Sequence, residues 1–206
     1  RNETVRMYQS NFLESLTHIH PALPHLIFVP VVAIGIRLGI AKGMEFFSLS
    51  LFFILGLFIW SLTEYTMHRF IFHMPAEKGW RKKLQFMLHG IHHDYPQDST
   101  RLVMPPPVSI PLAGALFFLF QTLLSAPHVF PFFSGFILGY LLYDTTHYAV
   151  HHWKWDNPLF LTLKRRHLNH HFIDPHHNFH VSMPFWDFVF RTYRSVSGAT
   201  VENPPA

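Results

Sequence analysis

The sequence predicts an all-α membrane protein with four transmembrane helices and a cytosolic helical cap that carries a histidine-rich dimetal site. Three observations predict this class. Four long apolar stretches alternate with polar blocks. Charged residues make up only 14% of the 206 residues, against about 25% in a soluble domain. Two of the polar blocks hold 14 of the 18 histidines, and ten of these form regularly spaced sets. We expect residues 1–206 to form one integral-membrane domain.

The first half of the chain predicts an interfacial helix followed by two crossings. Residues 1–20 have apolar side chains at helical spacing, which predicts an amphipathic helix that Pro21 ends. Two apolar stretches follow, at residues 23–40 and 46–62, with a tight turn between them. Each is close to the ~20 residues that cross a hydrocarbon core.

Two further crossings are predicted at residues 108–125 and 129–143. The last one is short and contains Pro131, Gly135 and Gly139, so we expect it either to begin within the interface or to pack closely against a neighbouring helix through its glycines. The polar blocks at 63–107 and 144–193 hold the histidines. A final interfacial helix is expected at 185–193, and the composition of residues 195–206 predicts a disordered tail.

The basic residues indicate the orientation. Four crossings place both histidine blocks on one side, together with every Lys and Arg except Arg37 and Lys42. The positive-inside rule makes that side cytosolic. We therefore expect a multi-pass protein of the endoplasmic reticulum if eukaryotic, or of the inner membrane if bacterial. The net charge of +4 is modest and forms no extended basic stripe, which favours a membrane surface over nucleic acid as a partner.

The spacing of the histidines indicates two metals. Residues four apart on an α-helix lie about 40° apart, and neighbouring residues about 100° apart. The pairs His89/His93, His147/His151 and His167/His171 can therefore each bind from one face. In the two His-x2-His-His motifs, the first and last histidines share one face, and the histidine between them (His92 or His170) points about 100° away, so that it can reach a second ion. His68 and His73 lie about 140° apart on such a helix, so we expect them to approach the site from different angles. The predicted ligands are His68, His73, His89, His92, His93, His147, His151, His167, His170 and His171.

The residue types limit the metal chemistry. The chain has no Cys, so the ligands must be nitrogen or oxygen, and imidazole suits Fe, Zn, Cu and Ni. Neither an HExxH motif nor a helical Glu-x-x-His repeat occurs. Two iron ions that activate O2 with electrons from an external donor fit this set best. Zinc in purified protein would be a redox-inert substitute.

Three alternative roles for the histidines fit the sequence less well. A metal transporter or store would place ligands within its crossings, where this chain has almost none. A zinc hydrolase lacks its usual base, and a histidine-rich sequence without function does not explain the symmetric clusters. We expect no catalytic side chain beyond the metal centre.

Outer residues can orient the ligands. Carboxylates commonly hold the far ring nitrogen of a metal-bound histidine. Asp144, Glu64, Asn169 and Asp94 are candidates because they lie close to the ligands in sequence. Asp144 could equally cap a helix or pair with a loop Arg. The remaining clustered histidines are expected at the substrate entrance: His152, His176, His177 and His180.

At these residues the chain resembles the fatty acid hydroxylase/sterol desaturase superfamily of integral-membrane histidine-box oxygenases. It is most similar to the fatty acid 2-hydroxylase group. The resemblance covers about residues 60 to 193. It includes Glu64-Tyr65 with His68-Arg69-Phe70, Leu88-His89-Gly90 with His92-His93, Arg101 to Pro106, Tyr143-Asp144 with His147, and His167-Leu168 with His170-His171.

The resemblance implies a di-iron, O2-dependent enzyme that hydroxylates C2 of a long acyl chain, free or within a sphingolipid. By position it implies the same ten histidine ligands. Eukaryotic members often carry an N-terminal cytochrome b5 domain, so we expect the electron donor to be a separate protein, of cytochrome b5 or ferredoxin type, or a domain trimmed from the start of this chain. The alternative is a hydroxylase or desaturase of another lipid, such as a sterol, carotenoid or alkane, with the same dimetal chemistry.

Overall fold

The computed structural model describes residues 4–76 and 78–195, and these residues form helices and loops without a strand. The predicted all-α class is therefore confirmed for the described part of the chain. The chain divides into two compact units. We call Arg6–Ser61 with Val103–Asp144 the bundle unit, and Leu62–Leu102 with Arg1–Val5 and Thr145–Ala206 the histidine unit.

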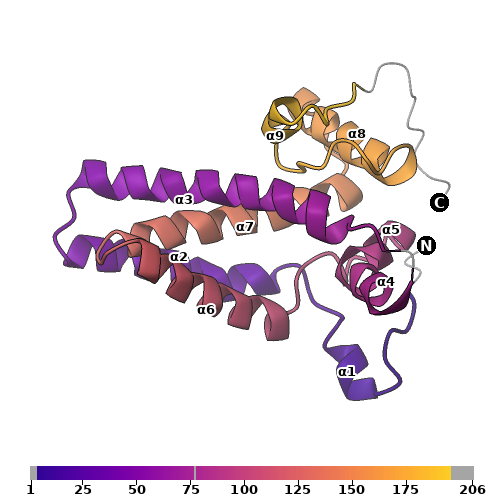
Figure 1. The fold of residues 1–206 in the computed structure, drawn as a ribbon, viewed down its shortest axis with the longest axis horizontal. Coiled ribbons are helices and arrows are strands. Elements are labelled where there is room, and N and C mark those ends of the chain that lie inside the picture. The colour runs from indigo at the N-terminus through magenta and orange to yellow at the C-terminus, as the bar shows by residue number, and fades with distance from the viewer. Residues whose placement is uncertain (1–3, 77, 196–206) are drawn as a thin grey trace. The chain divides into compact units, whose positions relative to one another are not determined.

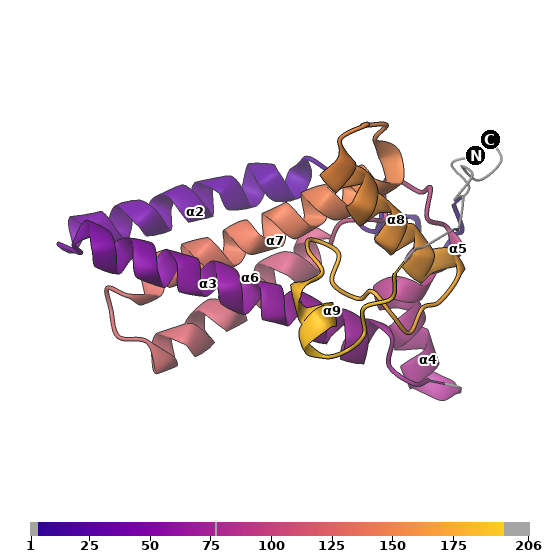
Figure 2. The ribbon, with the colours of Figure 1, turned by 90° about the horizontal axis from the view of Figure 1, so that it is seen from above.

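The bundle unit is built from four long helices that run side by side (Figures 1 and 2). They are α2 (Leu23–Ala41), α3 (Phe46–Thr66), α6 (Pro106–Leu123) and α7 (Val129–His152), and the ends of α3 and α7 enter the histidine unit. By length and composition three described segments are candidate membrane spans: Leu23–Ala41, Phe46–Phe72 and Pro106–Leu123. These spans make the chain an integral membrane protein.

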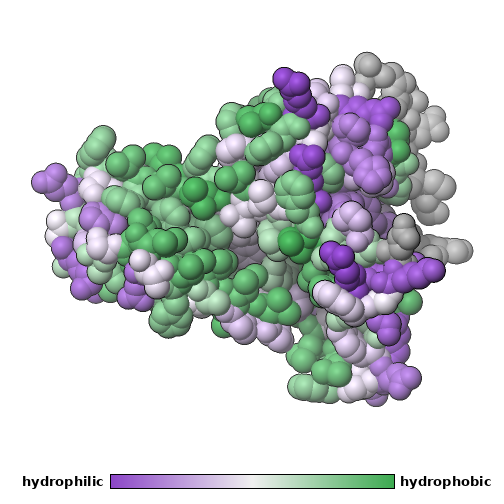
Figure 3. All heavy atoms as spheres, viewed as in Figure 1, coloured by the Kyte–Doolittle hydropathy of each residue, from purple (hydrophilic) through white to green (hydrophobic). Residues whose placement is uncertain are grey.

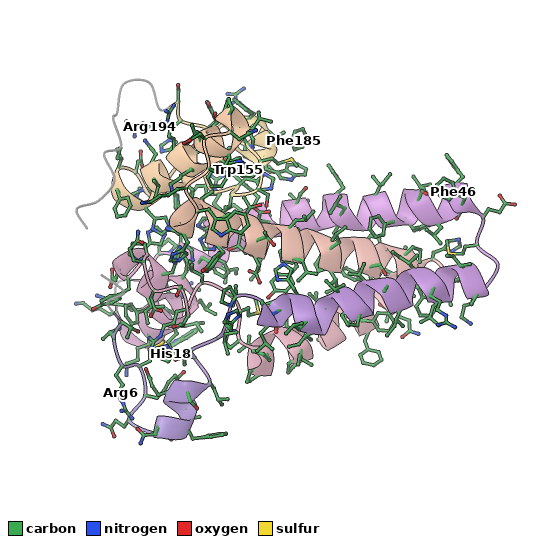
Figure 4. The ribbon with its side chains drawn as sticks, turned by 180° about the vertical axis from the view of Figure 1, so that it is seen from behind. Arg6, His18, Phe46, Trp155, Phe185 and Arg194 are labelled. Atoms are coloured by element: carbon green, nitrogen blue, oxygen red, sulfur yellow. The ribbon has the colours of Figure 1, made fainter. Side chains whose placement is uncertain are left out.

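The outside of these helices is apolar, as a lipid-facing surface requires. The face shown in Figure 3 is mostly hydrophobic over the bundle helices. Phe46 at the start of α3 is 86% exposed and points away from the ribbon (Figure 4). Such exposure of large apolar side chains is unfavourable in water and favourable in lipid.

Helix α7 is the buried centre of the bundle unit. Phe133, Phe136, Ile137, Tyr140 and Leu141 are buried in one core cluster, against partly buried side chains of α2, α3 and α6. This helix is not among the three candidate spans, although a fourth crossing was predicted at 129–143. The difference follows from its position, because a helix enclosed by other helices does not need a lipid-facing surface.

Two glycines permit the close approach of α3 and α7. A Cβ atom at Gly135 would overlap the backbone carbonyl of Phe53, and one at Gly56 would overlap the carbonyl of Phe132. The two backbones therefore meet without side chains between them, as small residues at membrane helix contacts allow.

The predicted N-terminal helix is shorter than expected. Of the described residues 4–20, only Asn11–Ser15 form a helix, α1. Ser10 caps it by accepting from the Leu13 N–H at 3.5 Å, and the Glu14 carboxylate accepts from the backbone of Met7 and Tyr8, both at 2.9 Å. These bonds stabilise an extended approach to the helix, so the prediction of a longer helix was wrong.

The histidine unit consists of short helices. They are η1 (Met67–Phe72), α4 (Gly79–Gln85), η2 (Phe86–Gly90), α5 (Ile91–Asp94), α8 (Pro158–Phe172) and α9 (Phe185–Val189). Asn157 caps α8 by accepting from Leu159 and Phe160, and Pro158 occupies its first turn. The predicted helix at 185–193 is present only as α9, since Arg191 adopts a φ of 57°. The predicted disordered tail, apart from Ser195, lies outside the described residues.

Candidate metal centre

Ten histidines of the histidine unit form two groups that could each hold a metal ion. Within each group, one ring nitrogen of every residue lies within 4.8 Å of the others. Cluster A consists of His68, His73, His89, His93 and His170; cluster B consists of His92, His147, His151, His167 and His171. These are the ten histidines predicted as ligands.

The doubled histidines divide between the clusters. His89 and His93 belong to cluster A, whereas His92 between them belongs to cluster B. In α8 the assignment is reversed, since His167 and His171 belong to cluster B and His170 to cluster A. This division follows from the helix, because residues four apart share a face and the intervening residue points about 100° away.

His68 and His73 share cluster A through a feature that helical spacing did not predict. The segment between them is a π-helix, in which the His73 N–H donates to the His68 carbonyl at 3.1 Å. A π-helix pairs residue i with residue i+5, and therefore brings five-residue neighbours to one face. The separation of about 140° expected for an α-helix therefore does not apply to this pair, whose rings are tilted by 42° and lie in one cluster. Such single π turns occur often at functional sites, and η2 before His92 is a second one.

Burial keeps these imidazoles neutral. Loss of solvent, assisted by the neighbouring histidines, lowers the pKa of His73 to about 2 and that of His93 to about 3. The same causes lower the pKa of His89, His92 and His167 well below the ordinary value. Metals bind the neutral ring, so the protonation state fits a metal site.

The ring nitrogens face one another in a way that fits a cation. The His89 Nε2 lies 3.1 Å from that of His68 and 3.0 Å from that of His93. A neutral imidazole has a single N–H, so three facing nitrogens leave lone pairs directed at each other. In cluster B both ring nitrogens of His171 are buried and have no hydrogen-bond partner among the described residues. A bound metal ion would accept these lone pairs, and the residues present therefore fit one in each cluster.

Backbone carbonyls orient two ligands of cluster A. The Nδ1–H groups of His68 and His170 donate to the carbonyls of Phe179 and His177, the latter at 2.8 Å. This bond fixes the tautomer and leaves the Nε2 lone pair for the metal.

The candidate orienting residues lie in different surroundings. Glu64 is buried, but it accepts from the backbone of Val181 and Ser182 at 2.8 and 2.9 Å rather than from a ligand ring. Asp94 is exposed at the end of α5, and Asn169 and Asp144 are buried on α8 and α7. No hydrogen bond of these four side chains to a ligand ring is seen among the described residues.

The histidines expected at an entrance do not form one group. His176 is exposed, His177 pairs with Asp174 at 2.9 Å, and the His152 ring packs against that of Tyr148 in a tilted arrangement. His180 is only 1% exposed and lies 3.4 Å from the Glu64 carboxylate. Its burial is inconsistent with a place at an open entrance, because Glu64 holds this segment in the interior.

Sequence reasoning did not single out Asp187 or Arg166. Asp187 is fully buried on α9 and accepts from the Arg166 guanidinium at 2.8 Å. Burial raises the pKa of Asp187 above its ordinary value, against the opposing effect of Thr192 and Arg166. No periodic pattern signals this pair, since the two residues are 21 positions apart in the chain.

An all-helical membrane architecture with two histidine clusters of this kind is typical of the histidine-box membrane oxygenases. The family model described as fatty acid hydroxylase matches residues 53–192. The chain belongs to the fatty acid hydroxylase family, and the resemblance noted in its sequence is confirmed.

Individual relatives support the same assignment. The chain is 38% identical over 203 residues to dihydroceramide fatty acyl 2-hydroxylase FAH2 of Arabidopsis thaliana, covering 98% of this chain and 85% of that protein. It is 42% identical over 187 residues to the ceramide very long chain fatty acid hydroxylase scs7 of Schizosaccharomyces pombe, covering 88% and 53%. Against the fatty acid 2-hydroxylase of Homo sapiens the identity is 40% over 143 residues, covering 68% and 38%. The chain thus spans about half of the fission yeast relative and less of the human one.

A solved structure shares the fold. The structure of full-length Scs7p, in which only the hydroxylase domain is visible, aligns with a TM-score of 0.85 and 36% identity. The alignment covers 91% of this chain and 72% of that one. Family membership makes the chain an oxygenase of the fatty acid hydroxylase type.

Proposed function

We propose that this protein hydroxylates C2 of a long-chain acyl group, free or within a sphingolipid, with O2 and a di-iron centre held by clusters A and B. The observation that carries the proposal is the gathering of ten histidines into two adjoining sets of five converging ring nitrogens. The names of the relatives, which specify fatty acyl 2-hydroxylation and ceramides, support the substrate class. Bound iron would supply O2 activation and the oxidation of a C–H bond.

The protein contributes binding and orientation. Neutral imidazoles provide the ligands, and the carbonyls of Phe179 and His177 hold two of them in the binding tautomer. We expect no side chain outside the ten to take part in the chemistry. The electron donor is proposed to be a separate protein of cytochrome b5 or ferredoxin type, or a domain joined to this chain.

The position of the ligands along the helices favours C2. His68 lies four residues before the end of the candidate span Phe46–Phe72, and His147 follows Tyr143, the end of the predicted fourth crossing, by four residues. We propose four crossings, with α7 as the enclosed fourth, and both clusters at the cytosolic interface. C2 adjoins the polar head of the lipid and reaches this depth without bending the acyl chain.

Lipid mass spectrometry with ¹⁸O2 tests the proposal. Cells that express the protein with a competent reductase are expected to accumulate 2-hydroxyacyl lipids that carry one ¹⁸O, and cells with His92→Ala are not. His176→Ala is the matched control, because that imidazole is exposed and outside both clusters. Labelled oxygen at another carbon would replace the C2 assignment, and the absence of any oxidised lipid would reject the enzyme function.

A further inference from the structure

The loop between α8 and α9 is held by two buried carboxylates. Four consecutive backbone N–H groups, from Phe179 to Ser182, donate to them. Those of Phe179 and His180 reach Asp187 at 2.9 and 3.1 Å, and those of Val181 and Ser182 reach Glu64 at 2.8 and 2.9 Å. Figure 2 shows this loop between α8 and α9. We name Glu64 and Asp187 together the carboxylate clamp.

Within the clamp, Asp187 is itself supported by a chain of buried and partly buried donors. The Asp187 carboxylate also accepts from Thr192 at 2.8 Å and from Arg166 at 2.8 Å. Tyr65 lies 3.0 Å from the Thr192 hydroxyl, and Arg69 donates to the Tyr65 hydroxyl at 2.7 Å. Charge-assisted bonds of this kind are about twice as strong as neutral ones, so the loop backbone has little freedom to move.

The clamped loop contacts the ligands of one cluster. Its Phe179 carbonyl accepts from His68, and the His177 carbonyl just before it accepts from His170. Both histidines belong to cluster A. In cluster B, the Nδ1 atoms of His151 and His167 have no hydrogen-bond partner among the described residues. The loop therefore orients cluster A and not cluster B.

We propose that Glu64 and Asp187 are positioning residues for cluster A alone, and that they act on its metal through the carbonyls of the clamped loop. This inference rests on the proposed metal centre. Loss of either carboxylate lets the loop move, so that His68 and His170 lose their fixed tautomers while cluster B keeps its ligand geometry. Outer partners of this kind typically change metal affinity about 10- to 100-fold.

Zinc affinity measured one cluster at a time tests the proposal. Zn²⁺ is the probe because it binds imidazole without redox chemistry. The variant His171→Ala leaves all ligands of cluster A in place, and His73→Ala leaves all ligands of cluster B in place. Asp187→Asn and Glu64→Gln are each introduced into both backgrounds, so that their effect on each cluster is measured separately. Affinity is measured on the detergent-solubilised full chain by competition with a chromophoric chelator, and elemental analysis gives the zinc content.

The clamp variants are expected to weaken zinc about 10- to 100-fold in the His171→Ala background, and to leave it within about twofold in the His73→Ala background. Asp156→Asn, an exposed position in the same unit, is expected to change neither. Equal weakening of both clusters, or of neither, would overturn the inference while leaving the metal centre in place. Failure of the unaltered chain to bind zinc at all would instead count against the proposed function.

Two milder variants allow the inference to be tested even if the carboxylate variants do not fold. Thr192→Val removes one donor to Asp187, and Ser182→Ala removes the hydroxyl that donates to Glu64 at 2.7 Å. If the carboxylate variants do not fold, these two are expected to weaken cluster A severalfold and to spare cluster B. An equal effect of both variants on the two clusters contradicts the inference.

Discussion

His92 and His93 are neighbours in the chain, yet their imidazoles belong to different metal clusters. The Nε2 of His92 lies 2.8 Å from that of His147, whereas the Nε2 of His93 lies 3.0 Å from that of His89. The helical turn of α5 separates the two rings, and α8 repeats the arrangement with His170 and His171.

Substitution of these neighbours is therefore expected to remove different metals. In our proposal His92→Ala impairs cluster B and His93→Ala impairs cluster A. Each single variant is therefore expected to retain about one metal ion per chain after dialysis, and the double variant is expected to retain none. Elemental analysis gives the content, and His176→Ala keeps both metals. Loss of both metals from either single variant would show that the clusters are not separate sites.

The stability of the metal-free protein is expected to fall as the pH decreases through about 6.5. Burial lowers the pKa of His89, His92 and His167 in the folded state, so the unfolded chain binds more protons below that pH. Each such histidine contributes stability that is present above the unfolded pKa, and about 1 kcal/mol of it is lost by pH 5.5.

Thermal unfolding in detergent at constant ionic strength, from pH 7.5 to 5.5, measures this dependence. Replacement of His92 by Gln, which does not titrate, should reduce the change in melting temperature over this pH range. A melting temperature that stays constant or rises on acidification would contradict the assignment of neutral buried rings.

Removal of the metal is expected to destabilise the histidine unit in particular. A ligand present at about 100 times its dissociation constant stabilises the folded state by about 2.7 kcal/mol per site. Treatment with a chelator should therefore lower the unfolding temperature and expose the 62–102 and 145–195 segments to protease, and added Zn²⁺ should reverse both effects. Proteolysis that begins in the bundle helices would instead indicate that metal binding stabilises the bundle unit rather than the histidine unit.

Gly135→Ala is expected to destabilise the bundle by about 3 kcal/mol, since the added methyl group would overlap the Phe53 carbonyl and a backbone cannot move aside as a side chain can. Gly114 on α6 is the matched control. A Cβ there meets nothing within 4 Å, so Gly114→Ala should be neutral or slightly stabilising because Ala favours the helix. Unfolding in detergent compares the two, and similar stabilities would refute the close crossing of α3 and α7.

The features that the sequence predicted correctly are those that depend on local periodicity. Apolar stretches indicated where α2, α3 and α6 lie, and the 100° step of the helix indicated that His92 and His170 would diverge from their neighbours. Both depend on residues within one or two turns. The same reasoning divided α7 at Asp144 because the polarity changes there, although the backbone continues as one helix to His152.

The features that were missed depend on distant residues or on unusual backbone. The carbonyl of Phe179 is 111 positions from His68, and Glu64 is 117 positions from its partner Val181. Nothing near either residue in the sequence identifies such partners. Glu64 was selected for its closeness to His68 along the helix, but its carboxylate is directed to a segment that only the tertiary fold brings near.

The π turn that joins His68 to His73 limits how this part of the protein can vary in length. If these residues formed an ordinary α-helix at their present spacing, the two imidazoles would lie about 140° apart and would not share a face. The number of residues between His68 and His73 and the type of helical turn that joins them can therefore change only together. Engineers who transfer this ligand pair to a regular helix would need a spacing of four residues instead of five.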